Sequence, residues 1–255
     1  MNPTNAPARR HKPLTRNRMG WISASLGPVS SAFVEFCKTG ACTTASPALD
    51  LGAGHGLASE AAWRAGACVI ANDLDTTELE RLASRLRQAN GDVGAQRLRI
   101  LSGRFPRELQ FEPESLGAVH ASNVFHFLTG NQLALGVSKI ARWLRPGGKL
   151  FVQAATPFQA PFVAFVPEYE QRVASGEKWP GWVEKIGAYS RHRLLGQMPR
   201  SVHLLDKEVL TRVCAVAELK VERAWFYRRE DLPVSLHWDG RESVGLIARK
   251  GTSWS

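Results

Sequence analysis

The most distinctive stretch of the sequence is an acidic residue followed by three glycines at alternate positions. It reads LDLGAGHG over residues 49–56. Glycine has no Cβ atom, so such a loop turns tightly and lets a ligand approach its backbone closely. The loop stands between an apolar segment and a helical pattern, so we expect it to join a strand to a helix. Taken alone, it fits either a dinucleotide or S-adenosylmethionine (SAM).

The charge of Asp50 favours one of these two ligands. A carboxylate at the end of the strand would repel the pyrophosphate of a dinucleotide seated on the helix N-terminus. It suits SAM, which carries an ammonium group beside a sulfonium. We therefore expect SAM as the cofactor and Asp50 as one of the residues that bind it.

A second acidic residue, Asp73, ends the next apolar segment, 17 positions after Gly56. A carboxylate there can accept hydrogen bonds from both ribose hydroxyls. Enzymes that use NAD share this feature, so it supports a nucleoside without choosing between the ligands. The alternative is that Asp73 caps the following helix, a role that Asp75 or Thr76 would fill equally well.

The elements that must position these residues alternate between strands and helices. Strands are expected at 48–51, 68–73, 98–101, 117–121 and 149–155, and helices at 29–39, 57–65, 76–89 and 131–144. A helix at 207–217 follows, and then strands at 220–227 and 243–249, which we expect to form an antiparallel pair at the sheet edge. Alternating strands and helices form parallel βαβ units. The predicted fold class is therefore α/β, with a doubly wound, mostly parallel sheet.

Residues 156–205 interrupt this alternation with many aromatic residues and five prolines. We expect a mostly helical, aromatic-rich insertion between the fifth and sixth strands, lying over one end of the sheet. Its aromatic side chains either line the acceptor pocket or form a small core under a lid. Tyr169 is the member that we single out as a candidate catalytic residue.

Half of the net charge of +10 lies within residues 1–18, which contain no acidic residue. We expect a basic, flexible arm there, followed by a single domain over residues 19–255. Such an arm either attracts an acidic partner or is merely a solvated tail. Just after the arm, Trp21 is expected to close over SAM.

The overall composition, with 44% hydrophobic and 22% charged residues, is that of an ordinary globular protein. It excludes collagen-like, coiled-coil and wholly disordered chains. No apolar run reaches the roughly 18 residues that span a bilayer, so we expect no membrane association. The four cysteines show no C-x-x-C spacing, which argues against a structural metal site and is typical of a protein in the reducing cytoplasm.

With these segments combined, the sequence resembles the class I SAM-dependent methyltransferases. The matching segments are the glycine loop with Asp50, then Asp73, then ASNVFHFL at 121–128 and LRPGGKL at 144–150, in the family's order and spacing over about residues 45–155. The resemblance implies a seven-stranded sheet of order 3-2-1-4-5-7-6, with SAM across the carboxyl ends of the first, second and fourth strands. The residues expected at the cofactor are Asp50, Gly52, Ala53, Gly54, Gly56, Asp73, Leu74, Gly103, Arg104, Phe105 and Asn123.

Two positions depart from the family pattern. The family often has an acid just after the third strand to hold the adenine amino group, whereas residues 102–106 read SGRFP. It also often begins the fourth strand with Asp, where this chain has Gly117. We therefore expect backbone groups to hold adenine and Phe105 to pack on its ring, unless Phe105 belongs to the core.

Methyl transfer from a sulfonium is an in-line displacement with an activated leaving group. The main task is to hold the nucleophile and the methyl carbon in line, and a base is needed only if the nucleophile starts protonated. His126, after the fourth strand, is the leading candidate for accepting a proton or orienting the acceptor, with structural hydrogen bonding as the alternative. Asn123 is expected to line the mouth of the site.

The acceptor is the least determined part of the prediction. Residues 123–126 read NVFH, unlike the NPPY-type motif for amino-nitrogen methylation of bases or glutamine. The basic arm favours a lysine amine of an acidic protein, such as a translation factor, and the chain has a weaker likeness to bacterial protein-lysine methyltransferases such as the one that modifies elongation factor Tu. The alternative is an N- or O-methyltransferase of small molecules. An RNA methyltransferase or a non-catalytic SAM-binding subunit ranks third.

Overall fold

The computed structural model describes residues 25–192 and 199–252, apart from the side chains of residues 89–95. The predicted basic arm and Trp21 lie outside these residues. The N-terminal half contains α1 (Pro28–Phe36), the π-helical turn η1 (Cys37–Ala41), β1 (Ala48–Leu51), α2 (Leu57–Arg64), β2 (Val69–Asp73), α3 (Thr76–Ala95), β3 (Leu98–Ser102), β4 (Leu116–Ser122), the 3₁₀ turn η2 (Phe125–Phe127), α4 (Gly130–Trp143) and β5 (Leu144–Ala155). The C-terminal half contains η3 (Ala160–Phe165), α5 (Val166–Ala174), β6 (Trp182–Val183), η4 (Ile186–Ala188), β7 (Val202–His203), α6 (Lys207–Val216), β8 (Leu219–Tyr227), η6 (Val234–Leu236) and β9 (Ser243–Lys250).

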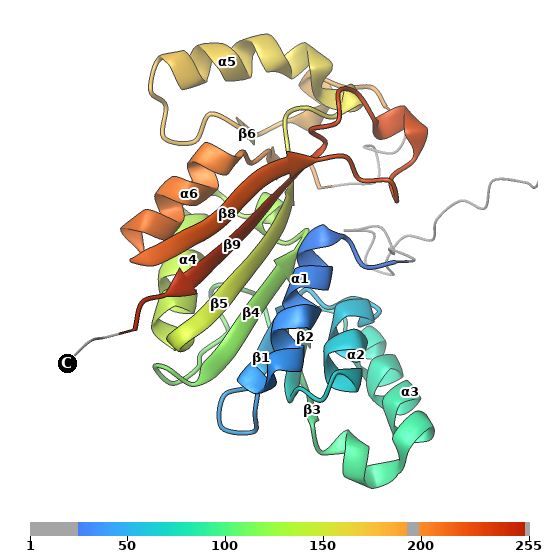
Figure 1. Ribbon diagram of the computed structural model, residues 1–255. Helices are drawn as coiled ribbons and strands as arrows, with labels where there is room; N and C mark the ends of the chain where they lie inside the picture. Colours follow the sequence, from blue (N-terminus) through green and yellow to red (C-terminus); the bar gives the residue numbers. More distant parts are fainter. Residues whose placement is uncertain (1–24, 193–198, 253–255) are drawn as a thin grey trace, which may run out of the picture.

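The main sheet has seven strands in the order β3-β2-β1-β4-β5-β9-β8 (Figure 1). The first five strands are parallel, and β9 runs antiparallel to both of its neighbours, β5 and β8. Counted in chain order, this is the predicted order 3-2-1-4-5-7-6. The doubly wound α/β fold and the antiparallel edge pair are therefore confirmed.

Helices cover both faces of the sheet and bury a separate core on each. Helices α4 and α6 pack over one face, onto which β1 directs Leu49 and Leu51 (Figure 1). Helices α1, α2 and α3 pack over the other face. Side chains alternate between the two faces of a strand. Asp50 therefore points to the α1 and α2 side, a placement that matters for its role below.

Local sequence decides where the two helices near the carboxyl end of the sheet begin. At α4, the Thr129 side chain accepts from the backbone N–H of Gln132, and the Gln132 side chain accepts from the backbone N–H of Thr129. At α6, the Asp206 carboxylate accepts the N–H of Val209 at 2.6 Å. Each cap of this kind contributes about 0.5–2 kcal/mol. Both helices thus begin at fixed points beside the segment that follows β4.

Among its described residues, the insertion is α-helical only in its first part. Beyond Ala174 these residues form the short ladder of β6 with β7 and the 3₁₀ turn η4. Gly181 accounts in part for this difference from the predicted, mostly helical insertion. The chain lies close to Leu204 there, because a Cβ atom on Gly181 would lie 1.8 Å from the carbonyl oxygen of Leu204. The aromatic side chains of the insertion gather in their own small core, which includes Phe158, Phe165 and Tyr169.

Two kinds of feature are absent from the described residues. No helix there is both long and apolar enough to cross a lipid bilayer. Nor do these residues bring together three or more His, Cys, Asp or Glu side chains in a metal-binding cluster.

Candidate cofactor and acceptor site

The glycine loop turns from β1 into α2 through three residues in the left-handed region. Gly52, Gly54 and Gly56 have φ values of 64°, 52° and 76°. A Cβ atom on Gly52 would lie 2.5 Å from the side chain of Val124, and one on Gly56 would lie 2.5 Å from that of Leu82. Backbone conformation and space therefore both require glycine at these two positions.

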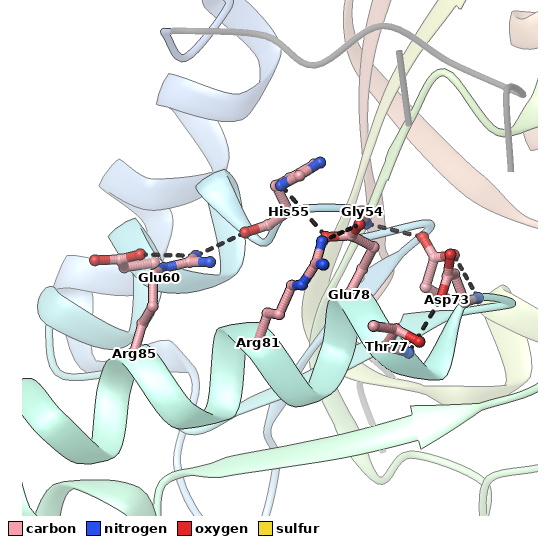
Figure 2. A network of polar contacts seen from close by, with 9 residues as sticks. Gly54, His55, Glu60, Asp73, Thr77, Glu78, Arg81 and Arg85 are labelled. Atoms are coloured by element: carbon pink, nitrogen blue, oxygen red, sulfur yellow. Dashed lines mark hydrogen bonds and ion pairs between the residues drawn. The ribbon is translucent and has the colours of Figure 1, made fainter. Parts of the chain in front are cut away.

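Asp73 ties this loop to the end of β2. Its Oδ2 accepts the backbone N–H of Gly54 at 2.8 Å, and its Oδ1 accepts that of Asp75 at 2.9 Å (Figure 2). Asp75 in turn accepts the N–H of Thr77 at 3.0 Å at the start of α3. Asp75 therefore makes the helix-start contact that was the alternative role for Asp73, and each oxygen of Asp73 keeps acceptor capacity for a ligand.

Helix α3 supports the loop from below (Figure 2). Arg85 donates to the carbonyl of His55 at 2.7 Å. Glu78 is buried; its Oε1 pairs with Arg81 at 3.1 Å, and its Oε2 lies 3.3 Å from Nδ1 of His55 without accepting a hydrogen bond from any described residue. Buried carboxylates beside a glycine loop fit a ligand such as SAM, which has hydroxyl donors and a positive charge. They do not fit a diphosphate, which is negatively charged.

Asn72 positions the segment that follows β3. Its side-chain amide donates to the carbonyls of Leu101 and Gly103, at 2.9 and 3.0 Å. These bonds place Gly103 next to the end of β2, and contacts of Gly103 and Arg104 with the cofactor stay predictions. Asn72 itself carries no signal in the sequence, because its two partners lie about thirty residues further along the chain.

Leu74 and Phe105 differ in how they could meet adenine. Leu74, directly after Asp73, is 44% exposed and leaves apolar surface beside the loop. Phe105 is buried against the rings of Phe125 and Trp143. This is the core alternative stated for Phe105, so its stacking on adenine stays a prediction without support from its position.

Asp50 does not point into the loop. It is 2% exposed, and its carboxylate oxygens bind Nδ1 of His120 at 2.7 Å and the hydroxyl of Ser59 at 2.5 Å. His120 lies beside Asp50 in the register of β1 with β4. A direct contact between Asp50 and the cofactor stays a prediction, and the structure assigns its carboxylate to the protein interior.

Asn123 and Arg229 meet at the carboxyl end of β4. Asn123 has a φ of 60°, which is uncommon outside glycine and concentrates at functional sites. Its Oδ1 accepts from Nη1 of Arg229 at 3.0 Å. Arg229 is buried, and its Nε and Nη2 pair with Asp231 at 2.9 and 2.6 Å. Arg229 follows β8 in a stretch without a recognisable motif, so it was not predicted as a site residue.

His126 is buried in the same region. Its Nδ1 accepts the backbone N–H of Ala155 at 3.4 Å, which assigns the ring proton to Nε2. Burial, and then the positive charge of Arg229, lower the pKa of His126 to about 3. The imidazole is therefore neutral at physiological pH and is a poor proton acceptor. Its geometry suits donating a hydrogen bond from Nε2, which is the orienting role.

Tyr169 has a partner inside the protein. Its hydroxyl donates to Oδ2 of Asp206 at 2.5 Å, so it joins the insertion to the start of α6. Burial, and then this hydrogen bond, raise the pKa of the Tyr169 phenol well above its usual value. A catalytic role for Tyr169 stays a prediction that its surroundings do not favour.

Gln153 and Tyr227 close the same end of the sheet beside α1. The Tyr227 hydroxyl donates to Oε1 of Gln153. A Cβ atom on Gly27, directly before α1, would lie 3.0 Å from this same oxygen. The start of α1 therefore meets the carboxyl end of β5, a contact that the sequence did not predict.

The insertion covers the segment that follows β4 (Figure 1). Trp179 packs onto Gly130, where a Cβ atom would come within 2.2 Å of the indole. Nδ1 of His203 lies 3.1 Å from the carbonyl of Leu128, and the N–H of Leu205 donates to the carbonyl of Ala155 at 2.8 Å. These contacts form a roof over Leu128, Gly130 and the end of β5 at Ala155.

Comparisons with known proteins give a consistent result. Residues 49–152 match the model of a methyltransferase domain family. No curated protein sequence matches the chain significantly. A SAM-dependent methyltransferase from Methanosarcina mazei superimposes with a TM-score of 0.62 at 14% identity, covering 90% of this chain and 100% of that one.

Two further similar structures contain S-adenosylhomocysteine (SAH). The 1,6-didemethyltoxoflavin N1-methyltransferase of Burkholderia thailandensis has a TM-score of 0.56 and 16% identity, with 88% of this chain and 79% of that chain covered. The geranyl diphosphate C-methyltransferase of Streptomyces coelicolor has a TM-score of 0.56 and 14% identity, with 86% and 77% covered. The matched domain, the sheet order and the glycine loop together show a SAM-dependent methyltransferase domain with the class I fold, with SAM as its cofactor.

Proposed function

We propose that this enzyme methylates a small molecule held between the carboxyl ends of β4 and β5 and the insertion. The observation that carries the proposal is the roof that Trp179, His203 and Leu205 form over Leu128, Gly130 and Ala155. Asn123 and His126 belong to the same segment after β4, and His126 also contacts Ala155. A small molecule fits a covered site of this kind better than the surface of a folded protein does.

The chain's own residues would bind and orient this acceptor. When bound, SAM supplies a methyl group on a sulfonium that is already a good leaving group. The Nε2–H of His126 can donate to an acceptor oxygen or nitrogen, and the Asn123–Arg229 pair fixes the wall beside it. Because His126 is a poor proton acceptor at neutral pH, the arrangement favours a nucleophile that is unprotonated before transfer.

The names of the similar structures support a small acceptor. The two that contain SAH are named for geranyl diphosphate and for 1,6-didemethyltoxoflavin, which are both small molecules. Their low identity to this chain limits the support to the class of acceptor.

A lysine of an acidic protein, favoured by the sequence, is the second candidate. Its main argument is the basic arm of residues 1–18, which lies outside the described residues. The division into this arm and a domain over 19–255, with residues 156–205 as the substrate insertion, is also a proposal, as is a cytoplasmic location.

The test is transfer of label from [methyl-³H]SAM into a cell extract, followed by separation of protein, RNA and small molecules. Label is expected in the small-molecule fraction with the wild-type enzyme and not with Gly54→Arg, whose long side chain would fill the loop. Label in protein would overturn the proposal and put the lysine acceptor first. Label in no fraction of any extract would indicate a SAM-binding subunit without catalytic activity.

A further inference from the structure

Four polar side chains meet in the otherwise apolar layer between the sheet and helices α1 and α2. They are Ser30 on α1, Asp50 on β1, Ser59 on α2 and His120 on β4, and each is at most 7% exposed. Buried charge is costly unless it is paired and hydrogen-bonded, so a carboxylate here needs dedicated partners. The cluster supplies them.

The geometry fixes Asp50 from both sides. Asp50 and His120 are neighbours in the register of two parallel strands, with Oδ1 2.7 Å from Nδ1. The Ser59 hydroxyl donates to Oδ2 at 2.5 Å. Nε2 of His120 lies 3.0 Å from the Ser30 hydroxyl, and its ring stacks on Phe33 with centroids 4.7 Å apart. The imidazole is thus held by two hydrogen-bond partners and an aromatic face.

The hydrogen bonds of the cluster can all run in one direction. The Ser30 O–H donates to Nε2 of His120, the Nδ1–H of His120 donates to Asp50, and the Ser59 O–H donates to the other oxygen of Asp50. In this arrangement both oxygens of Asp50 accept hydrogen bonds, as those of an ionised carboxylate do. The order serine–histidine–aspartate matches that of a hydrolase triad, but Ser30 is buried and cannot reach a substrate.

The position of the Asp50 carboxylate allows its charge to act on a bound cofactor. Asp50 is two residues before Gly52, where the cofactor loop begins, and it is shielded from water. A charge in a low-dielectric interior acts over a longer distance than one in water. SAM and its product SAH differ by the methyl group and by the positive charge on sulfur, whereas their ribose, adenine and amino acid parts are the same.

We propose that His120 and Ser30 are positioning residues that hold Asp50 as a buried anion, and that this charge makes the site prefer SAM over SAH without touching either. The preference would help fresh SAM to displace the product after each transfer. The proposal depends on the identity of the cofactor and not on that of the acceptor, so it stands or falls separately from the proposed function.

The experiment is titration calorimetry of SAM and of SAH, with folding of each variant checked by circular dichroism. Asp50→Asn keeps the shape of the side chain and removes its charge. It is expected to weaken SAM binding about tenfold, the scale of one unit charge about 10 Å away, while SAH binding changes less than about twofold. The control is Asn72→Ala, which removes no charge and is therefore expected to weaken SAM and SAH binding by the same factor.

Two further variants test the supporting residues. His120→Phe retains an aromatic ring beside Phe33 and removes both hydrogen bonds, and it is expected to lower the preference for SAM as Asp50→Asn does. Ser30→Ala removes one hydroxyl. It is expected to weaken SAM binding relative to SAH binding by a smaller factor. Equal loss of SAM and SAH binding in Asp50→Asn would overturn the proposal. If His120→Phe does not fold, a wild-type SAM-to-SAH preference in Ser30→Ala would overturn the role of the supporting residues.

Discussion

Trp179 of the insertion lies directly against Gly130, the first residue of α4. A Cβ atom on Gly130 would come within 2.2 Å of the indole, so the ring occupies the space that any other residue would need. Because Gly130 also follows the capping residue Thr129, this contact fixes the insertion to the segment after β4. The roof over the proposed acceptor position therefore depends on the absence of a side chain at Gly130.

Gly130→Ala is expected to displace Trp179 and to slow methyl transfer without weakening SAM binding. A displacement of about 1 Å at the acceptor costs about 100-fold in rate, whereas the cofactor loop is untouched. The assay is label transfer from tritiated SAM, with calorimetry for binding. Gly187→Ala is the matched control, because nothing lies within 4 Å of its added Cβ. Wild-type transfer by Gly130→Ala would show that the roof does not position the acceptor.

Arg229→Lys is expected to reduce methyl transfer while leaving SAH affinity unchanged. Lysine keeps the charge but not the planar fork that reaches both Asp231 and Asn123, so the wall of the acceptor position loosens. Label-transfer rates and calorimetry separate the two effects. Arg249→Lys, at an exposed pair with Glu222, serves as the control. A loss of SAH binding equal to the loss of rate would instead place Arg229 at the cofactor.

Asn72→Ala is expected to weaken both stability and SAH binding. It removes two hydrogen bonds to the segment after β3, each worth about 1 kcal/mol, so the Tm should fall by about 4–8 °C. Looser placement of Gly103 should weaken SAH binding about tenfold. Thermal unfolding and calorimetry test this, with the exposed Asn131→Ala as the control. Unchanged SAH binding would show that this segment does not contact the cofactor.

Two buried histidines are expected to make the fold sensitive to acid. Burial is the main reason that the pKa falls to about 3 for His126 and to about 4 for His203. In the unfolded chain both would take up a proton near pH 6.5, so between about pH 6.5 and 4 the unfolded state binds more protons than the folded state. Stability is therefore full above about pH 6.5 and falls as the pH is lowered, by up to about 1.4 kcal/mol per pH unit for each histidine.

Urea unfolding at a series of pH values measures this slope. His203→Gln removes one titrating group from the interior, and its stability should fall less steeply between pH 6.5 and 4 than that of the wild-type protein. His237→Gln offers a comparison at a half-buried ring, whose Nε2 lies 2.9 Å from the carbonyl oxygen of Arg229. An identical slope in His203→Gln and in the wild type would contradict the assignment.

Several parts of the fold could be predicted because their signals are local in sequence. The glycines of the loop are required by the backbone conformation of a few consecutive residues. The ends of β1, α2 and β9 follow from short apolar patterns, and most predicted boundaries fall within a few residues of those observed. The order of the sheet came from the family resemblance, since periodicity alone does not say which strands are neighbours.

The partners of individual side chains were decided only by the tertiary structure. Asp50 meets His120 because β4 enters the sheet beside β1 in one particular register, 70 residues away in sequence. Asn123 meets Arg229 across 106 residues, and Phe105 packs on Phe125 in the core. The sequence thus indicates which residue types lie near a site. The direction in which each side chain points depends on strand order and register, and these are determined only when distant segments pack together.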